Sequence, residues 1–105
     1  MFVAEQLDQF GISWNRPLRG HRYEWNGSRL YYPDFYLPSY DLFIEVKGFQ
    51  RDRDLAKWSV IEKLLVIKQK EIDEMRDGAI DIRTLVEDKT KWFWADSSIG
   101  RTVTS

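Results

Sequence analysis

The segment Leu42–Lys47 constrains the fold of this chain more than any other stretch, because its side chains alternate with the period of a β-strand. It follows an extended, aromatic-rich segment, Arg29–Leu37, and the turn Pro38–Asp41 separates the two. We therefore predict a β-hairpin, with Pro33 making the first arm an edge strand or a bulge. One face of the second arm carries Leu42, Ile44 and Val46, and the other carries Phe43, Glu45 and Lys47.

The length of the turn predicts the register of this hairpin. If Leu37 faces Leu42, counting back along both arms places Asp34 opposite Glu45. Facing side chains in an antiparallel pair lie on the same face of the sheet, with Cβ atoms about 4.5–5.5 Å apart. Lys47, two residues after Glu45, shares that face. The count therefore predicts two carboxylates and an ammonium group on one side of the hairpin.

This predicted cluster favours metal-dependent chemistry. Two facing carboxylates repel, and a hard divalent cation between them would remove the repulsion. The chain has no cysteine and a single histidine, His21, so we expect oxygen ligands, which indicate Mg²⁺ or Mn²⁺ rather than zinc. Lys47 could contact a phosphate or help to deprotonate a water molecule. Such an arrangement suits hydrolysis of a phosphodiester.

The same residues also have a purely structural interpretation. Asp34 follows Pro33 and could simply form a turn. Glu45 and Lys47 could be ordinary solvent-facing residues of a half-buried strand.

The rest of the chain predicts helices on both sides of these strands. We expect a helix over Phe2–Phe10, a strand beginning at Ile12–Trp14, and a strand His21–Trp25 that turns at Asn26-Gly27. After the hairpin we expect a helix from Asp52 or Asp54 to about Ile61, a strand Lys63–Ile67, a helix Lys70–Arg76 and a last strand through Ile80, Ile82 and Thr84. The result is a single small α/β or α+β domain, a mixed sheet flanked by helices over residues 1–95, with a flexible tail over residues 96–105.

Charge and composition give weaker indications of function. The 16 basic and 17 acidic residues leave a net charge of −1, which is not the overall basic charge of many nucleic-acid-binding proteins. Between Trp14 and Leu30, however, four arginines oppose only Glu24, a local charge of about +3. The lack of cysteine, of a long apolar run and of a leader-like N-terminus predicts a cytoplasmic protein without a membrane span.

The flanks of the hairpin carry a resemblance to a known family. Tyr32-Pro33-Asp34-Phe35, Leu37-Pro38 and Phe43 to Gly48 resemble the active-site hairpin of the PD-(D/E)XK nuclease superfamily. The similarity is strongest to the compact branch that contains phage junction-resolving endonucleases, mismatch-repair-type nicking enzymes and some homing endonucleases. The segment after it, with Arg51, Arg53, Lys57 and Trp58 leading into Leu64–Ile67, is similar to the helix and strand that follow the motif there.

The resemblance implies a restriction-endonuclease-like fold, the activity of a metal-dependent DNA endonuclease, and an origin in a phage or mobile element. By position, Asp34, Glu45 and the carbonyl of Val46 would hold the metal, and Lys47 would be the catalytic lysine. The family also places an acidic residue on the helix before the sheet. Glu5 would fill that role here, with Asp8 one turn later as a substitute, although the first helix is unusually short.

Other residues are candidates for contacts with DNA. Gln50 would line the site or be a surface residue, and the basic residues would contact phosphates or be solvated. Arg53 and Lys57 lie four apart and would share a helix face. His21 is a poor candidate for a general base, and Trp14 and Trp58 fit a core, whereas Trp92 and Trp94 could stack on bases, mediate dimerisation or pack in the core. The nucleic-acid-binding candidates are Arg16, Arg19, Arg22, Gln50, Arg51, Arg53 and Lys57.

A second function remains open at this point. The short first helix and near-neutral charge are compatible with a non-enzymatic DNA-binding or regulatory module that keeps a nuclease fold, or with one subunit of a larger nuclease. In either case we expect DNA as the partner and no small-molecule cofactor. A resolving enzyme that cuts two strands symmetrically would act as a homodimer.

Overall fold

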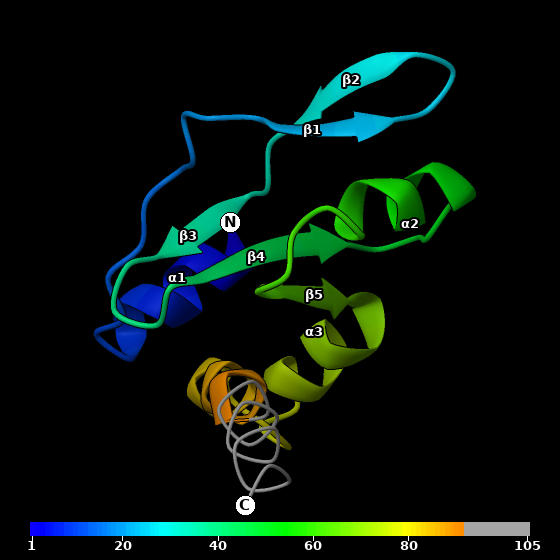
Figure 1. Cartoon of the computed structure of the whole chain (residues 1–105). Coiled ribbons are helices and arrows are strands. Elements are labelled where there is room, and N and C mark those ends of the chain that lie inside the picture. Colours follow the sequence, from blue (N-terminus) through cyan, green and yellow to red (C-terminus); the bar gives the residue numbers. More distant parts are fainter. Residues whose placement is uncertain (92–105) are drawn as a thin grey trace, which may run out of the picture.

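The computed structural model describes residues 1–91, which form a small α+β domain with two sheets and four helices (Figure 1). The elements in chain order are α1 (Phe2–Gln9), β1 (His21–Glu24), β2 (Ser28–Tyr31), β3 (Phe35–Leu37), β4 (Leu42–Lys47), α2 (Asp52–Trp58), β5 (Leu64–Lys68) and α3 (Gln69–Arg76). Residues 82–91 form the fourth helix. The predicted domain end at residue 95, the tail and the two tryptophans Trp92 and Trp94 lie outside the described residues.

The larger sheet has three strands in the order β3-β4-β5, with β4 in the centre. β3 and β4 are antiparallel, and Leu37 pairs with Leu42 and Phe35 with Ile44. The register predicted from the turn length is therefore confirmed for these pairs. β5 runs parallel to β4, with Glu45 beside Val66, and α2 lies in the connection between the two strands, as parallel pairing requires a crossover.

The second sheet is the hairpin of β1 and β2, which confirms the predicted turn at Asn26-Gly27. Three residues, Trp25 to Gly27, separate the paired residues Glu24 and Ser28, and Asn26 and Gly27 have positive φ, 52° and 113°.

The prediction of one extended segment over Arg29–Leu37 was wrong. The segment forms two strands in different sheets, since β2 ends at Tyr31 and β3 begins at Phe35. Pro33 lies in the break, where its lack of an N–H prevents a continuous ladder. The predicted strand at Ile12–Trp14 is also absent, and a single bridge between Asn15 and Tyr36 lies close by.

The expected last strand through Ile80, Ile82 and Thr84 was wrong as well, because residues 82–91 are helical. The Asp81 carboxylate accepts a hydrogen bond of 2.8 Å from the backbone N–H of Thr84, which caps the first turn of this helix. Ile82 and Val86, one turn apart, are both fully buried. These two side chains are therefore buried along one face of a helix, and the alternating burial expected of a strand is not seen here.

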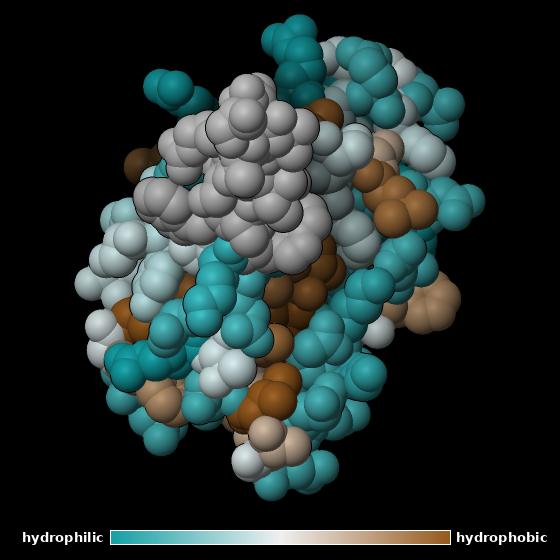
Figure 2. Space-filling view, turned by 60° about the horizontal axis from the view of Figure 1, so that its bottom comes forward, coloured by the Kyte–Doolittle hydropathy of each residue, from teal (hydrophilic) through white to brown (hydrophobic). Residues whose placement is uncertain are grey.

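The main core lies on one face of the three-stranded sheet, beneath α1, α3 and the last helix. Phe35, Leu37, Leu42 and Ile44 supply the sheet side of this core. The helices supply Val3, Leu7, Ile72, Met75, Ile82 and Val86. Figure 2, which brings this side of the molecule forward, shows a mostly hydrophilic surface interrupted by separate hydrophobic patches.

A smaller apolar cluster covers part of the opposite face. The β1–β2 hairpin contributes Tyr23 and Tyr31, and the sheet contributes Leu64 with Phe43 and Val66 beside it. Ala56 and Trp58 of α2 pack against the same cluster. Glu45 and Lys47 alternate with the core residues of β4 and therefore point to this second face, toward α2 and the hairpin.

Candidate functional site

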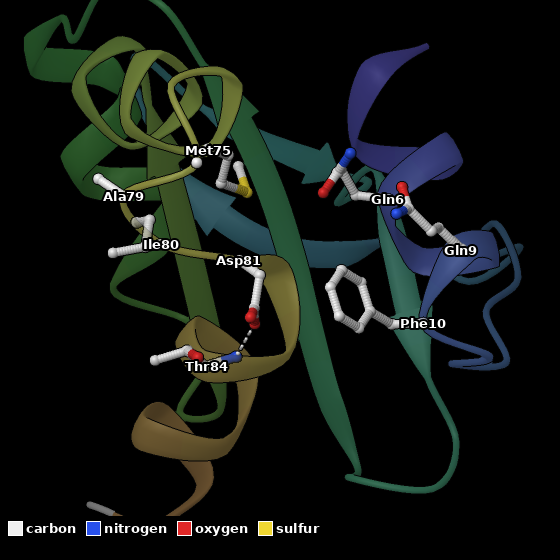
Figure 3. A pocket seen from close by; sticks show the side chains of 9 residues that line it. Gln6, Gln9, Phe10, Met75, Ala79, Ile80, Asp81 and Thr84 are labelled. Atoms are coloured by element: carbon white, nitrogen blue, oxygen red, sulfur yellow. Dashed lines mark hydrogen bonds between the residues drawn. The ribbon is translucent and has the colours of Figure 1, made fainter.

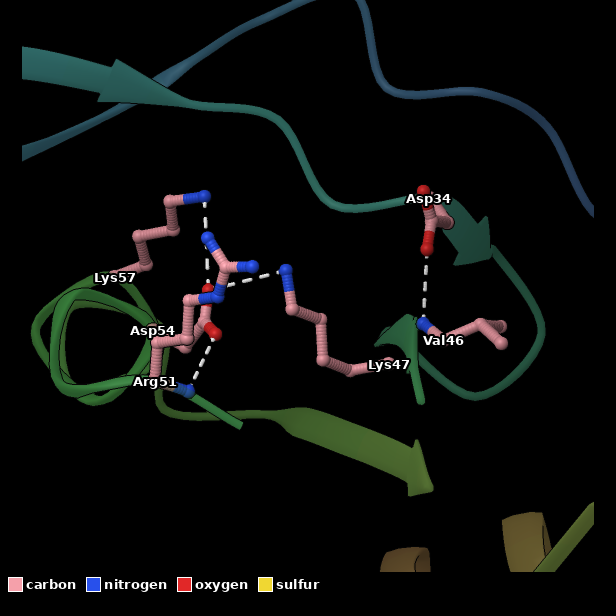
Figure 4. Close-up of polar contacts among 6 residues, drawn as sticks. All are labelled: Asp34, Val46, Lys47, Arg51, Asp54 and Lys57. Carbon is pink, nitrogen blue, oxygen red and sulfur yellow. Dashed lines mark hydrogen bonds and ion pairs between the residues drawn. The ribbon is translucent and has the colours of Figure 1, made fainter. Parts of the chain in front are cut away.

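Asp34 is held against β4 by its own side chain. Its Oδ2 atom accepts a hydrogen bond of 2.8 Å from the backbone N–H of Val46, as Figure 4 shows. Asp34 stands just before β3, and the antiparallel pairing of β3 with β4 brings it level with the end of β4. The interpretation of Asp34 as a residue that only forms a turn is therefore incomplete. Its carboxylate also reaches across the hairpin and binds the neighbouring strand.

Glu45 lies in β4 and is buried, with 7% of its surface exposed. It is therefore not a solvent-facing strand residue. Its Oε1 atom and the hydroxyl of Tyr31 are both buried without a well-formed hydrogen bond among the described residues, although the two groups lie close enough to influence each other's pKa. Burial, and then the negative charge of Asp34, raise the pKa of Glu45 to about 7, although Tyr31 and Lys57 act in the opposite direction. Asp34 directly precedes the pair of Phe35 with Ile44, which brings it level with Glu45, and its charge contributes to this shift.

Lys47 points toward α2 rather than toward the carboxylate pair. Its Nζ atom lies 3.4 Å from Oδ1 of Asp54, and the Nζ atom of Lys57 lies 3.8 Å from the same oxygen (Figure 4). The Asp54 side chain is only 3% exposed, whereas the Lys47 side chain is 32% exposed. One buried carboxylate thus anchors two ammonium groups from two different elements.

Asp54 occupies the first turn of α2, where its other oxygen has a backbone partner. Oδ2 accepts a hydrogen bond of 2.9 Å from the N–H of Arg51, the residue that caps the helix. Burial acts to raise the pKa of Asp54, but this hydrogen bond and the charges of Lys47 and Lys57 outweigh it, so the pKa is lowered. Asp54 is therefore ionised near neutral pH.

Tyr31 connects the hairpin to both groups of charges. Burial, and then the negative charge of Glu45, raise the pKa of its hydroxyl, with smaller contributions from Asp34 and Asp54. The Nζ atom of Lys57 lies 5.7 Å from the centre of the Tyr31 ring, within cation–π range. The tyrosine therefore shares its buried surroundings with Glu45 and contacts one of the two lysines.

The donor set fits a hard divalent cation. Asp34 and Glu45 provide adjacent carboxylates, and the unpartnered buried oxygen of Glu45 is a group for which a bound cation would compensate. Within residues 1–91 no three acidic, histidine or cysteine side chains are grouped to hold a metal ion.

The first helix lies on the other face of the sheet. Val3 and Leu7 of α1 join the main core, and Glu5, which lies between them on the helix, is exposed to solvent. Asp8 accepts a hydrogen bond of 2.8 Å from the indole of Trp14. Neither acid joins Asp34 and Glu45 in a three-residue cluster of the kind described above.

The predicted DNA-contacting residues are arranged in two groups. Arg16, Arg19 and Arg22 precede or enter β1 and are exposed, with the guanidinium of Arg16 5.7 Å from the Phe35 ring. Gln50, Arg51 and Arg53 are exposed around the start of α2. Lys57 differs from Arg53, because it is partly buried and directed to Asp54. His21 packs edge-on against Phe43 at 5.0 Å between ring centres.

A separate cavity of about 360 Å³ lies between α1 and the segment that leads into the last helix. Figure 3 shows Gln6, Gln9 and Phe10 facing Met75, Ala79, Ile80, Asp81 and Thr84 across it. None of the residues that line it belongs to the candidate site.

Asp54 and Tyr31 were not predicted from the sequence to belong to the site. The sequence contains a signal for Asp54, because an acidic residue in a first helical turn, three residues before Lys57, often both caps the helix and forms an ion pair. It contains no comparable signal for Tyr31, whose position depends on how the hairpin folds over the sheet.

The described residues therefore define a small α+β domain with a buried charged site between its two sheets. The chain matches no protein-family model, no curated protein sequence and no solved structure. No helix within residues 1–91 is long and apolar enough to cross a membrane.

Proposed function

We propose that this protein is a metal-dependent endonuclease that hydrolyses phosphodiester bonds of DNA. The observation that carries the proposal is the pair Asp34 and Glu45, just before β3 and on β4, in which burial, and then the charge of Asp34, raise the pKa of Glu45 to about 7. Folding such a pair together without a cation is unfavourable, and Mg²⁺ or Mn²⁺ would compensate for it. The resemblance of the hairpin to the PD-(D/E)XK superfamily supports the same function.

In this proposal Asp34 and Glu45 hold the metal, with the carbonyl of Val46 as a further oxygen ligand. A divalent ion bound there would supply positive charge to the phosphate as negative charge develops on it during hydrolysis. Lys47 supplies an ammonium group on the same face of β4 and would orient the scissile phosphate. The exposed arginines, Arg51 and Arg53 at α2 and Arg16, Arg19 and Arg22 before and in β1, would contact the flanking phosphates.

The substitution Lys47→Ala is expected to slow cleavage by about 100-fold, the usual effect of removing a positioned charged group or proton donor. Supercoiled plasmid and a synthetic four-way junction would be incubated with Mg²⁺, with Mn²⁺ and with EDTA. Cleavage should require metal and should fall in both Lys47→Ala and Asp34→Ala. Lys70→Ala, which removes an exposed lysine of α3, serves as the matched control and should cleave like the wild type.

The same assay separates the alternatives. Binding without cleavage in any metal would favour a non-enzymatic nuclease-fold module or an incomplete subunit. A preference for the junction over the plasmid would assign a structure-specific substrate. Symmetric cutting of both strands would further require two copies of the chain.

A further inference from the structure

Asp54 stands apart from the residues to which the proposed function gives a role. It is 2% exposed, it belongs to α2 rather than to the hairpin, and two lysines converge on its Oδ1 atom. The chain also contains an ordinary ion pair for comparison. Lys63 and Asp41 lie 3.3 Å apart with 47% and 64% of their side chains exposed. Such an exposed pair holds its partners weakly, whereas a buried carboxylate must stay paired.

We infer that Asp54 is a positioning residue that holds the ammonium groups of Lys47 and Lys57 side by side, so that both contact the same phosphate of the substrate. This inference rests on the proposed function. Two lysines brought together without a counter-charge would repel each other and occupy many rotamers. A single oxygen at 3.4 and 3.8 Å from the two nitrogens restrains both of them.

The position of α2 explains why this anchor stays fixed. The second oxygen of Asp54 is bound to the N–H of Arg51, so the carboxylate cannot rotate without breaking the helix cap. Lys57 is further located by the Tyr31 ring, and its charge acts on Glu45. The two ammonium groups and the one carboxylate together carry a net positive charge. Of the two lysines, Lys57 acts electrostatically on Glu45, so this excess positive charge extends toward the carboxylate pair, where an anionic phosphate would need it.

In this inference Lys57 is a second cation that contacts the phosphate, in addition to Lys47. It is not merely a solvated lysine on the surface of α2. The inference also distinguishes Lys57 from Arg53, which is exposed on the same helix and has no ion pair with Asp54. A positioning role predicts a loss of rate without a loss of DNA affinity, because Asp54 itself would repel the phosphate.

The test compares Asp54→Asn with Asp41→Asn, which removes the carboxylate of the exposed lysine pair far along the sheet. Single-turnover cleavage with Mg²⁺ would be measured together with the dissociation constant for DNA in Ca²⁺. Asp54→Asn should cleave about 10- to 100-fold more slowly, a range typical of residues that orient active groups. Its DNA affinity should be unchanged or tighter, and Asp41→Asn should match the wild type. An unchanged rate, or a parallel loss of rate and affinity, would overturn the inference.

A second measurement keeps the inference testable if Asp54→Asn does not fold or if the wild type does not cleave. The lysines of the wild-type protein would be labelled by reductive ¹³C-methylation, and Lys47→Arg and Lys57→Arg would assign two of the methyl signals. Both signals should be displaced from those of exposed lysines such as Lys70. Coincidence with the exposed lysines would refute the anchoring role, whereas absence of wild-type cleavage alone would refute the proposed function.

Discussion

Replacing Glu45 with glutamine is expected to abolish DNA cleavage and at the same time to stabilise the metal-free protein at pH 8. Cleavage should fall at least about 1000-fold, because the metal would lose one of its two carboxylate ligands. The gain in stability follows from the raised pKa of Glu45, which burial and then the charge of Asp34 move from 4.5 to about 7. The glutamine side chain resembles the neutral form that the folded protein prefers.

The sign of the pH dependence follows from that shift. Because the folded pKa lies above the unfolded value, the contribution of Glu45 to stability is fully present below pH 4.5 and is lost as the pH rises through about 7. The free energy of unfolding of Glu45→Gln should therefore equal that of the wild type near pH 4.5. It should exceed the wild-type value by about 3 kcal/mol at pH 8, from about 1.4 kcal/mol per pKa unit.

Urea denaturation in EDTA at several pH values measures this difference. Glu24→Gln changes an exposed glutamate of β1 in the same way and provides the control. A difference between Glu45→Gln and the wild type that stays constant from pH 4.5 to pH 8 would show that Glu45 is not raised in pKa, and would remove the main support for the carboxylate pair.

Phe35→Ala is expected to lose about 3–5 kcal/mol of stability, which is a large part of the stability of a domain of this size. Phe35 is fully buried, directly follows Asp34 and packs edge-on against Trp14 at 5.1 Å between ring centres. The truncation would leave a cavity in the main core beneath the strand that carries the site.

Phe49→Ala is the matched control, because Phe49 is 72% exposed and its removal should change stability by no more than about 0.5 kcal/mol. Urea denaturation at pH 7 compares the two variants. Equal losses in both, or a loss of less than about 1 kcal/mol in Phe35→Ala, would contradict the described packing of β3 on the helices.

The sequence predicts the central hairpin well because local physics determines it. The alternation of Leu42–Lys47 identifies the strand, and the turn length is sufficient to give the pairing of Leu37 with Leu42. The same count brings Asp34 to β4, where its hydrogen bond to Val46 lies. These features depend on residues fewer than 15 positions apart in the chain.

The errors arise where tertiary packing decides between local options. Ile80 and Ile82 alternate as in a strand, but Ile82, Leu85 and Val86 also have helical spacing, and Asp81 provides the cap. Burial of Ile82 and Val86 against the main core selects the helix. The break between β2 and β3 is similar, because only Pro33 indicates that the two strands enter different sheets.

The candidate site was predicted only in part, because tertiary packing also determines some of its contacts. Spacing alone places Asp34 level with Glu45 and puts Lys47 on the same face of β4, whereas the direction of Lys47 toward Asp54 depends on how α2 returns over the sheet. Burial of Glu45 likewise depends on Tyr31 and the β1–β2 hairpin, which no local pattern of β4 indicates.

Calorimetric titration of Mn²⁺ into the wild type and into Glu45→Gln at pH 7 tests the central claim most directly, because it asks whether the two carboxylates hold one cation. In two buffers with different ionisation enthalpies, the wild type should bind one ion per chain and release about half a proton, since Glu45 with a pKa of about 7 is half protonated there. Glu45→Gln should bind far more weakly and release no proton. Equal binding by both proteins, or none by the wild type, would contradict the assignment of Asp34 and Glu45 as a metal site.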